Sequence, residues 1–309
     1  MRIAFVFPGQ GSQSVGMLSG FADNAVVNET MQQADKALGF SLTELIAEGP
    51  AETLSLTVNT QPAMLASSVA FYRAWLAAGG AKPAVMAGHS LGEYSALCAS
   101  GVFTLEEAVR LVRYRAEVMQ GAVPVGVGGM AAVIGLSDED VEAACAEARQ
   151  VGAVEAVNFN APGQVVIAGE KAALAKAIEA AKARGCRRAI ELPVSAPFHS
   201  SLLAPAGVKL AERLATVDLK PQEVPVIANV DVEVHETADA IRNALARQAS
   251  SAVQWVRTIE RMKAEGVTDV VECGPGKVLT GLLRRIAPDM KGHNIYNEET
   301  LQAVLANLR

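Results

Sequence analysis

The serine with the strongest chemical context in this chain is Ser90, which lies in the segment GHSLG. This segment has the G-x-S-x-G pattern of a nucleophile elbow, a sharp turn between a strand and a helix that presents a serine hydroxyl. A short apolar run at residues 83–87 precedes it, and a stretch of small, helix-compatible residues at 91–100 follows it. The flanking elements are those that the motif requires. The sequence therefore predicts that Ser90 is a nucleophile rather than part of a plain structural turn.

A serine nucleophile needs a base, and the chain has 4 histidines. His199 is the best candidate, because the segment 193–198 before it returns from a predicted inserted domain, where a loop would reach a crevice. An exposed loop histidine is the alternative. His89 is adjacent to Ser90 in the elbow and cannot easily turn back onto it, so we expect a supporting or packing role. The histidines that we expect at the surface are His235 and His293.

Two glycine-rich loops resemble phosphate-binding motifs without satisfying them. The loop GQGSQS at 9–14 lacks the third glycine of a dinucleotide fingerprint, and GPGKV at 274–278 lacks the Ser or Thr of a P-loop. The first loop follows a predicted strand at 3–7, where a main-chain amide can help to form an oxyanion hole. The two amides expected to do so are those of Gln10 and Leu91.

Composition and charge exclude several classes of function. The net charge of -6 disfavours nucleic acid as the main partner, because phosphate binding requires a positive surface. The 4 cysteines are scattered without a C-x-x-C pair, and no H-E-x-x-H segment occurs, so we expect no metal. The first apolar run is too short for a signal peptide, and no stretch is suited to a bilayer. These features predict a globular cytoplasmic protein that does not bind membranes.

The elements that must position these residues form an α/β pattern interrupted by a second unit. Many Ala, Gly and Val residues and few aromatic ones favour packed α/β layers. Within residues 126–195 the order of predicted elements is βαββαβ, which is typical of a ferredoxin-like fold. We therefore predict a discontinuous catalytic domain at 1–125 and 196–309, with a small domain inserted at 126–195. The other strands expected in the large domain are 224–229, 269–273 and 293–297; the helices expected there are 24–38, 42–48, 61–78, 104–119, 238–248, 253–265, 278–286 and 299–308.

Several of these segments together resemble one enzyme family. FPGQGSQ at 7–13, GHSLGEYS at 88–95, NFNAPGQ at 158–164, VQW at 253–255 and GPG at 274–276 are similar to the malonyl-CoA:acyl carrier protein transacylases of bacterial type II fatty-acid synthesis. The similarity runs essentially from end to end, and the segments occur in the family's order. It implies an α/β-hydrolase-like large domain with a parallel sheet and a ferredoxin-like subdomain. It also implies malonyl-CoA and acyl carrier protein as partners, with no cofactor.

The resemblance assigns catalytic roles to residues of this chain. Ser90 matches the nucleophile that takes the malonyl group from CoA as an ester, and His199 matches the base that activates it. The family has no third carboxylate; a main-chain carbonyl at the position of Gln248 orients the imidazole. Neutral imidazole would take the serine proton and return it to the departing thiolate.

The resemblance also identifies an arginine for the malonyl carboxylate. Arg115 matches this position, and a planar guanidinium can bind a carboxylate through two parallel hydrogen bonds. Residue chemistry alone leaves Arg110 and Arg113 equally eligible, because a charged helical run is usually a solvated face. Residues of family motifs expected to line the site are Gln61, Asn160 and Phe198.

Phe198, directly before His199, bears on the acyl group, because an aromatic residue there accompanies unsubstituted malonyl in related acyltransferases. Docking of an acidic carrier protein requires a local basic patch. By resemblance the best pair is Arg284 and Arg285, and ordinary solvated charges are the alternative. The other basic candidates are Lys182, Arg184, Arg187 and Arg188.

Three other functions use the same features. A serine hydrolase or thioesterase would use Ser90 and His199 but release free acid. A noncatalytic carrier-binding module would bind the carrier protein without forming an acyl-enzyme. An acyltransferase of a polyketide pathway would share every motif named above.

Overall fold

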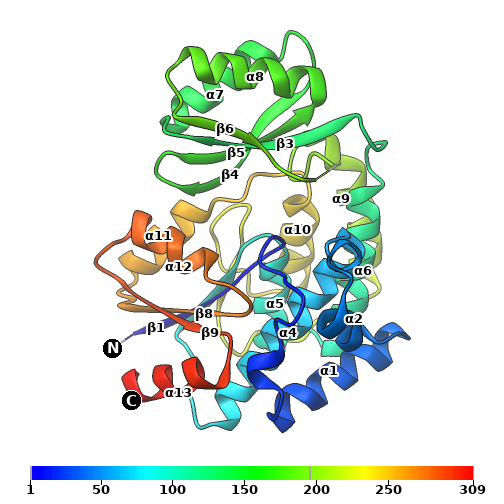
Figure 1. Ribbon diagram of the computed structural model, residues 1–309, viewed down its shortest axis with the longest axis vertical. Helices are drawn as coiled ribbons and strands as arrows, with labels where there is room; N and C mark the ends of the chain where they lie inside the picture. The colour runs from blue at the N-terminus through cyan, green and yellow to red at the C-terminus, as the bar shows by residue number, and fades with distance from the viewer. Residues whose placement is uncertain (1, 195, 309) are drawn as a thin grey trace.

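A parallel sheet of five strands forms the centre of the larger part of the molecule (Figure 1). The computed structural model describes residues 2–194 and 196–308. The strand order is β7-β2-β1-β8-β9, and each neighbouring pair is parallel. The strands are β1 (Ile3–Phe7), β2 (Val85–Gly88), β7 (Val226–Ile227), β8 (Asp269–Cys273) and β9 (Lys291–Ile295).

The register of β1 and β2 brings two predicted site segments to one edge of the sheet. Phe7 pairs with Gly88, so both strands end at the same level. In parallel sheets, binding sites form at the carboxyl ends of the strands. The loop that holds Gln10 and the turn that holds Ser90 therefore lie side by side.

Both faces of the parallel sheet are covered by helices, because alternate strand residues point to opposite sides. Phe5 and Phe7 pack into a core with the helices of the N-terminal half, whereas Ala4 and Val6 pack against Trp255 and its neighbours. The helices of the larger part are α1 (Ala25–Leu38), α2 (Leu42–Glu48), α3 (Ala51–Leu54), α4 (Thr57–Ala77), α5 (Leu91–Ala99), α6 (Leu105–Gln120), α9 (Ala204–Ala215), α10 (Ala238–Gln248), α11 (Trp255–Ala264), α12 (Val278–Ile286) and α13 (Glu298–Asn307), with short 3-10 helices at Ser19–Phe21 and Ser201–Leu203.

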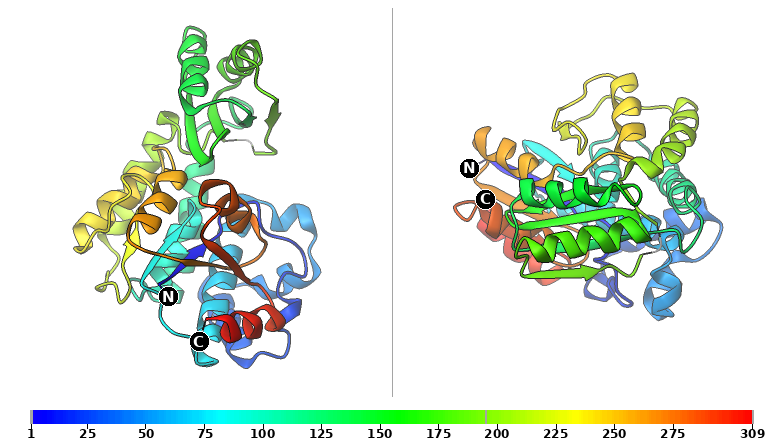
Figure 2. Two further views of the ribbon diagram at one scale, coloured as in Figure 1. Left: turned by 90° about the vertical axis from the view of Figure 1, so that its left-hand side faces the viewer. Right: turned by 90° about the horizontal axis from the view of Figure 1, so that it is seen from above.

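A separate antiparallel sheet lies at the top of Figure 1, and Figure 2 shows two helices lying across its outer face. Its strand order is β4-β5-β3-β6. The inner face contributes Met130 and Val166 to the main core, and the main chain of β4 pairs with Val253. The small sheet therefore covers the same edge of the large sheet. Its elements are β3 (Gly128–Ile134), α7 (Asp138–Ala148), β4 (Val154–Ala161), β5 (Gln164–Glu170), α8 (Lys171–Ala183) and β6 (Arg188–Glu191).

The predicted mixed α/β architecture is confirmed, with a parallel sheet and a second, antiparallel one. Several elements differ from the sequence prediction; among them, the short helix α3 and the two 3-10 helices were not predicted. The strand predicted at 224–229 is only Val226–Ile227, because Asn229 turns toward the elbow and bonds there. Helix α9 was not predicted; Pro205 and Gly207 weaken its pattern, but proline is tolerated in the first turn.

Across residues 2–194 and 196–308, no helix combines the length and apolar character that crossing a membrane would demand.

Candidate active site

Ser90 occupies a strained turn between β2 and α5. Its φ of 52° is rare for a residue with a side chain, as a nucleophile elbow requires. A Cβ atom on Gly88 would lie 1.8 Å from the carbonyl carbon of Gly92. One on Gly92 would lie 2.0 Å from the carbonyl oxygen of Phe7. Both glycines are therefore required by close packing, and the motif has the strand-turn-helix context that the sequence predicted.

His199 contacts the serine from a loop before α9. Its Nε2 atom lies 2.7 Å from the Oγ of Ser90, and its Nδ1 lies 2.8 Å from the main-chain carbonyl oxygen of Gln248. A carbonyl can only accept, so Nδ1 carries the proton and donates to Gln248. Nε2 is then free to accept the proton of Ser90. Loop position and tautomer both fit a general base.

Burial and the nearby Arg115 lower the pKa of His199 to about 3. The side chain is 4% exposed, so its charged form loses hydration, and the positive guanidinium adds repulsion. The imidazole is therefore neutral at physiological pH. Neutral imidazole is the form that can accept a proton.

Arg115 reaches the same hydroxyl from α6. Its Nη1 donates to Oε1 of Gln61 at 2.8 Å, and its Nη2 donates to Oγ of Ser90 at 3.1 Å and to Oε1 of Gln248 at 2.9 Å. The side chain is 1% exposed, and the guanidinium lies 5.1 Å from the ring centre of Tyr94. Within the described chain, Nε of Arg115 has no hydrogen-bond partner. A buried cation is thus held beside the serine.

The helical phase of α6 separates Arg115 from its neighbours. Arg110 is exposed, and its Nε donates to the carbonyl of Ala37. Arg113 lies over the ring of Phe40, with its guanidinium 4.7 Å from the ring centre. Arg115 instead falls among the buried residues of the helix. Of the three arginines left open by residue chemistry, the structure brings only Arg115 to Ser90.

Two buried residues that the sequence analysis did not assign to the site, Asn229 and Glu93, stabilise the elbow through hydrogen bonds. Oδ1 of Asn229 accepts from the main-chain amide of Ser90 at 2.7 Å, and its Nδ2 donates to the carbonyl of Gly88 at 2.7 Å. Oε2 of Glu93 accepts from the amide of Asn229 at 2.9 Å and from Nε2 of Gln248 at 2.8 Å. Glu93 lies in the GHSLGEYS segment, which was a usable signal. Asn229 follows a strand end, where site residues often lie.

Gln10 and Leu91 line the same cavity as Ser90. Leu91 is the first residue of α5, so its amide has no partner inside the helix. Among the described residues, neither amide donates to a protein acceptor. Two unpaired donors beside a serine are suited to an oxyanion.

The cavity has a volume of about 270 Å³. Among its described lining residues, Arg115 alone carries a permanent charge. The other lining residues are Pro8, Gly9, Gln10, Gly11, Ser12, Gln61, His89, Ser90, Leu91, Met119, Met130, Asn158, Asn160, Gln164, Val166, Leu192, Val194, Phe198, His199, Val278, Leu279 and Leu282. The cavity therefore favours an acyl group that ends in a negative charge.

The remaining histidines support the structure. Nε2 of His89 donates to Oδ1 of Asn160 at 2.7 Å, which joins the elbow to β4. His235 and His293 are not free surface residues as predicted. They are partly buried against Asp231 and Asp269, respectively, which accept their hydrogen bonds. No cluster of three or more His, Cys, Asp or Glu side chains suited to a metal occurs in the described chain.

The two basic residues predicted for docking lie at the end of α12, and both are exposed. Arg285 donates to the carbonyl of Pro162 at 2.7 Å and to Oε1 of Gln164. Among the described residues, Arg284 has no such contact. Arg284 is therefore the freer of the two cations.

Comparison with known proteins places this chain in a family. The family model "Acyl transferase domain" matches residues 4–295. The chain is 51% identical over 305 residues to the malonyl CoA-acyl carrier protein transacylase of Escherichia coli K12, covering 98% of this chain and 99% of that protein.

Solved structures agree with this match. An acyl-carrier-protein S-malonyltransferase from Burkholderia pseudomallei is 57% identical, with a TM-score of 0.98, covering 99% of this chain and 100% of that one. A malonyl-transacylase in complex with its type II PKS acyl-carrier protein is 46% identical, also with a TM-score of 0.98, covering 99% and 100%. This chain therefore belongs to the acyl transferase family and, within it, to the malonyl CoA-acyl carrier protein transacylases.

Proposed function

We propose that this enzyme moves a malonyl group from malonyl-CoA to the phosphopantetheine thiol of acyl carrier protein through an ester on Ser90, supplying fatty-acid chain elongation. One observation carries the proposal: Oγ of Ser90 lies within hydrogen-bond distance of both a neutral imidazole and a buried guanidinium. The imidazole can activate the hydroxyl, and the guanidinium can hold a carboxylate on the acyl group.

In the first half-reaction, Nε2 of His199 takes the proton of Ser90 while Oγ bonds to the malonyl carbonyl carbon. The carbon–sulfur bond to CoA then breaks, and the proton passes from His199 to the leaving thiolate. The Gln248 carbonyl, which accepts from Nδ1 of His199 at 2.8 Å, stabilises the transient imidazolium. No carboxylate contacts the imidazole in the described chain.

In the second half-reaction, the carrier thiol gives its proton to His199 and its sulfur bonds to the acyl carbon. The ester bond to Ser90 breaks, and the proton returns to Oγ. In both steps the amides of Gln10 and Leu91 donate to the negative oxygen of the tetrahedral intermediate.

In this proposal, other residues that line the cavity determine which acyl group binds. Arg115 holds the malonyl carboxylate, and Gln61 keeps the guanidinium in place through its bond to Nη1. Phe198 and Asn160 line the same cavity, and Oδ1 of Asn160 accepts a hydrogen bond from His89. In this proposal Phe198 limits the space available to the acyl group. No cofactor enters any of these steps.

We propose that Arg284 and Arg285 bind the acidic carrier protein. Both are exposed at the end of α12, whose first residues Val278 and Leu279 line the cavity. Complementary charge there would guide the carrier thiol toward Ser90.

The finer description of the fold is also a proposal. We describe the larger part as α/β-hydrolase-like, at 1–125 and 196–309, and residues 126–195 as a ferredoxin-like subdomain. The order β3-α7-β4-β5-α8-β6 and the sheet order β4-β5-β3-β6 support the second description. The cytoplasmic location expected from the sequence stays a prediction that cell fractionation tests.

A transfer assay with malonyl-CoA and holo acyl carrier protein tests the proposed function, with Ser90→Ala as the control. We expect malonyl-carrier protein from the wild type and none from the variant. Release of free malonate without the carrier protein would identify a hydrolase instead. Carrier binding without turnover would identify a binding module. Replacing the carrier with one from a polyketide pathway measures how narrowly the enzyme serves fatty-acid synthesis.

A further inference from the structure

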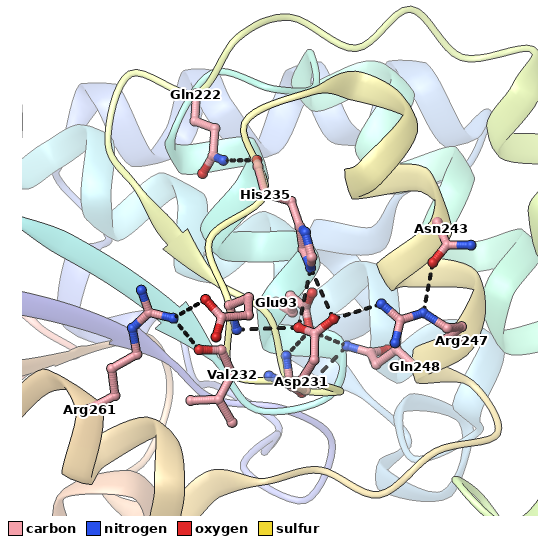
Figure 3. Close-up of polar contacts among 11 residues, drawn as sticks. Glu93, Gln222, Asp231, Val232, His235, Asn243, Arg247, Gln248 and Arg261 are labelled. Carbon is pink, nitrogen blue, oxygen red and sulfur yellow. Dashed lines mark hydrogen bonds and ion pairs between the residues drawn. The ribbon is translucent and has the colours of Figure 1, made fainter.

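The carboxylate of Glu93 is buried directly beneath the active site. It lies in the first turn of α5 and is 2% exposed. Burying a carboxylate costs free energy unless hydrogen bonds compensate. Here Oε2 accepts from the amide of Asn229 at 2.9 Å and from Nε2 of Gln248 at 2.8 Å. Figure 3 shows Glu93 and Gln248 close to Asp231, on which His235 and Arg247 converge.

Glu93 fixes which end of the Gln248 side-chain amide faces the active site. Nε2 of Gln248 lies 2.8 Å from Oε2 of Glu93, 3.0 Å from the carbonyl oxygen of Ser90 and 3.4 Å from Oδ1 of Asn229. Oε1 of Gln248 accepts from Nη2 of Arg115 at 2.9 Å. Turning the amide over would place its oxygen against three oxygens and its NH2 group against a guanidinium. The carboxylate is the strongest acceptor of the three and makes the shortest contact.

The side-chain amide of Gln248 links Glu93 to Arg115, because it bonds to both of them. Around Glu93, Arg115 on α6 attracts the carboxylate, whereas Asp231 in the loop after β7 repels it. His235 lines the small cavity on its other side. In the described structure Glu93 bonds to neither the hydroxyl of Ser90 nor the imidazole. Any effect on the reaction must therefore pass through its neighbours.

We propose that Glu93 is a positioning residue for acyl selectivity: through the Gln248 amide, it holds the Arg115 guanidinium where a carboxylate on the acyl group binds. This rests on the proposed function, because it assumes that Arg115 holds malonyl. Glu93 then sets the preference for malonyl over acyl groups that lack a carboxylate. Its effect on the chemistry at Ser90 itself is small.

The test measures kcat/KM for acylation with malonyl-CoA and with acetyl-CoA in Glu93→Gln. The assay is run at about pH 8, above the raised pKa of Glu93, so that the isosteric amide removes a charge and weakens the bond to Gln248. We expect the malonyl-to-acetyl ratio to fall about tenfold, the size of a weakened charged hydrogen bond. Glu106→Gln is the matched control, since this glutamate lies in the first turn of α6 but is exposed. Its ratio should equal that of the wild type.

Combining Glu93→Gln with Arg115→Met distinguishes a positioning role of Glu93 from a purely structural one. In an Arg115→Met background, Glu93→Gln should leave the ratio unchanged, because the group that Glu93 positions is gone. Gln248→Met keeps the main-chain carbonyl and deletes the amide. Gln248→Met should lower the malonyl-to-acetyl ratio as much as Glu93→Gln does. The double variant should have the same ratio as Gln248→Met alone. If Glu93→Gln does not fold, Gln248→Met alone tests the proposal.

Equal losses with both donors would overturn the proposal, as would a ratio that falls further when Glu93→Gln is added to Arg115→Met. An unchanged ratio in both Glu93→Gln and Gln248→Met would also overturn it. A wild-type enzyme that forms no malonyl ester would instead refute the proposed function, so the two failures are distinguishable.

Discussion

Replacing Arg115 should abolish the preference for malonyl while preserving most of the reaction with acetyl groups. Arg115→Met keeps much of the buried volume and removes the charge. Leaving a buried charge without its partner costs about 3 to 5 kcal/mol. At about 1.4 kcal/mol per factor of ten, kcat/KM for malonyl-CoA should fall roughly a hundredfold to several thousandfold.

The acetyl reaction loses much less in the same variant. Acetyl has no carboxylate, so it loses only the bond from Nη2 of Arg115 to Oγ of Ser90, at 3.1 Å. One such bond contributes about 1 kcal/mol, or about fivefold. Removing the positive charge also raises the pKa of His199 and makes it a stronger base, which partly offsets the loss.

Single-turnover acylation with each CoA thioester, read by rapid quench, measures both values. Arg113→Met is the matched control on the same helix, because the Arg113 side chain contacts Phe40 and Glu117 away from the cavity. It should change neither rate. Equal losses for malonyl and acetyl in folded Arg115→Met would refute the reasoning and make Arg115 a purely structural residue.

Three further predictions follow from charges in the structure. Reversing Arg284 and Arg285 to Glu should raise KM for the carrier protein and leave acylation by malonyl-CoA unchanged; an unchanged carrier KM would remove the docking proposal. Because the pKa of His199 is lowered to about 3, acylation by acetyl-CoA should stay constant from about pH 7.5 to about pH 5.5, and a fall centred near 6.5 would contradict it. Burial raises the pKa of Glu93 from 4.5 to about 7, so its stabilising contribution is full below pH 4.5 and is lost as pH rises through 7. Glu93→Gln should therefore gain unfolding free energy relative to the wild type between about pH 5 and about pH 8, by up to about 3 kcal/mol at 1.36 kcal/mol per pH unit; a difference independent of pH in denaturant titrations would contradict this.

Elements with local signals were predicted best. Helix α6 begins where expected because Oγ1 of Thr104 accepts from the amide of Glu107, and α1 begins where the side chain of Asn24 accepts from Val27. These bonds lie within a few residues, so the sequence contains them. The short β7 was overpredicted because Asn229 is pulled to the elbow by contacts 139 and 141 positions away. Such contacts leave no local pattern.

The candidate site was predicted only in part, because some of its contacts are local in the sequence and others join distant residues. The elbow is a local motif, so the sharp turn at Ser90 could be predicted from the residues alone. Choosing Arg115 required the resemblance, although the apolar positions Ala108, Leu111 and Met119 of α6 place it on the buried face at spacings of three and four. Glu93 meets Gln248 across 155 positions, and only the tertiary structure shows that contact.

Intact-mass spectrometry after brief exposure to malonyl-CoA, acetyl-CoA or methylmalonyl-CoA tests the central claim most directly, with peptide mapping and Ser90→Ala alongside. We predict a malonyl adduct on Ser90 that is absent from the variant and disappears when holo acyl carrier protein is added, with malonyl-carrier protein formed in its place. A malonyl adduct that persists in Ser90→Ala, or a folded wild-type protein that forms no adduct with any donor, would contradict the proposed mechanism.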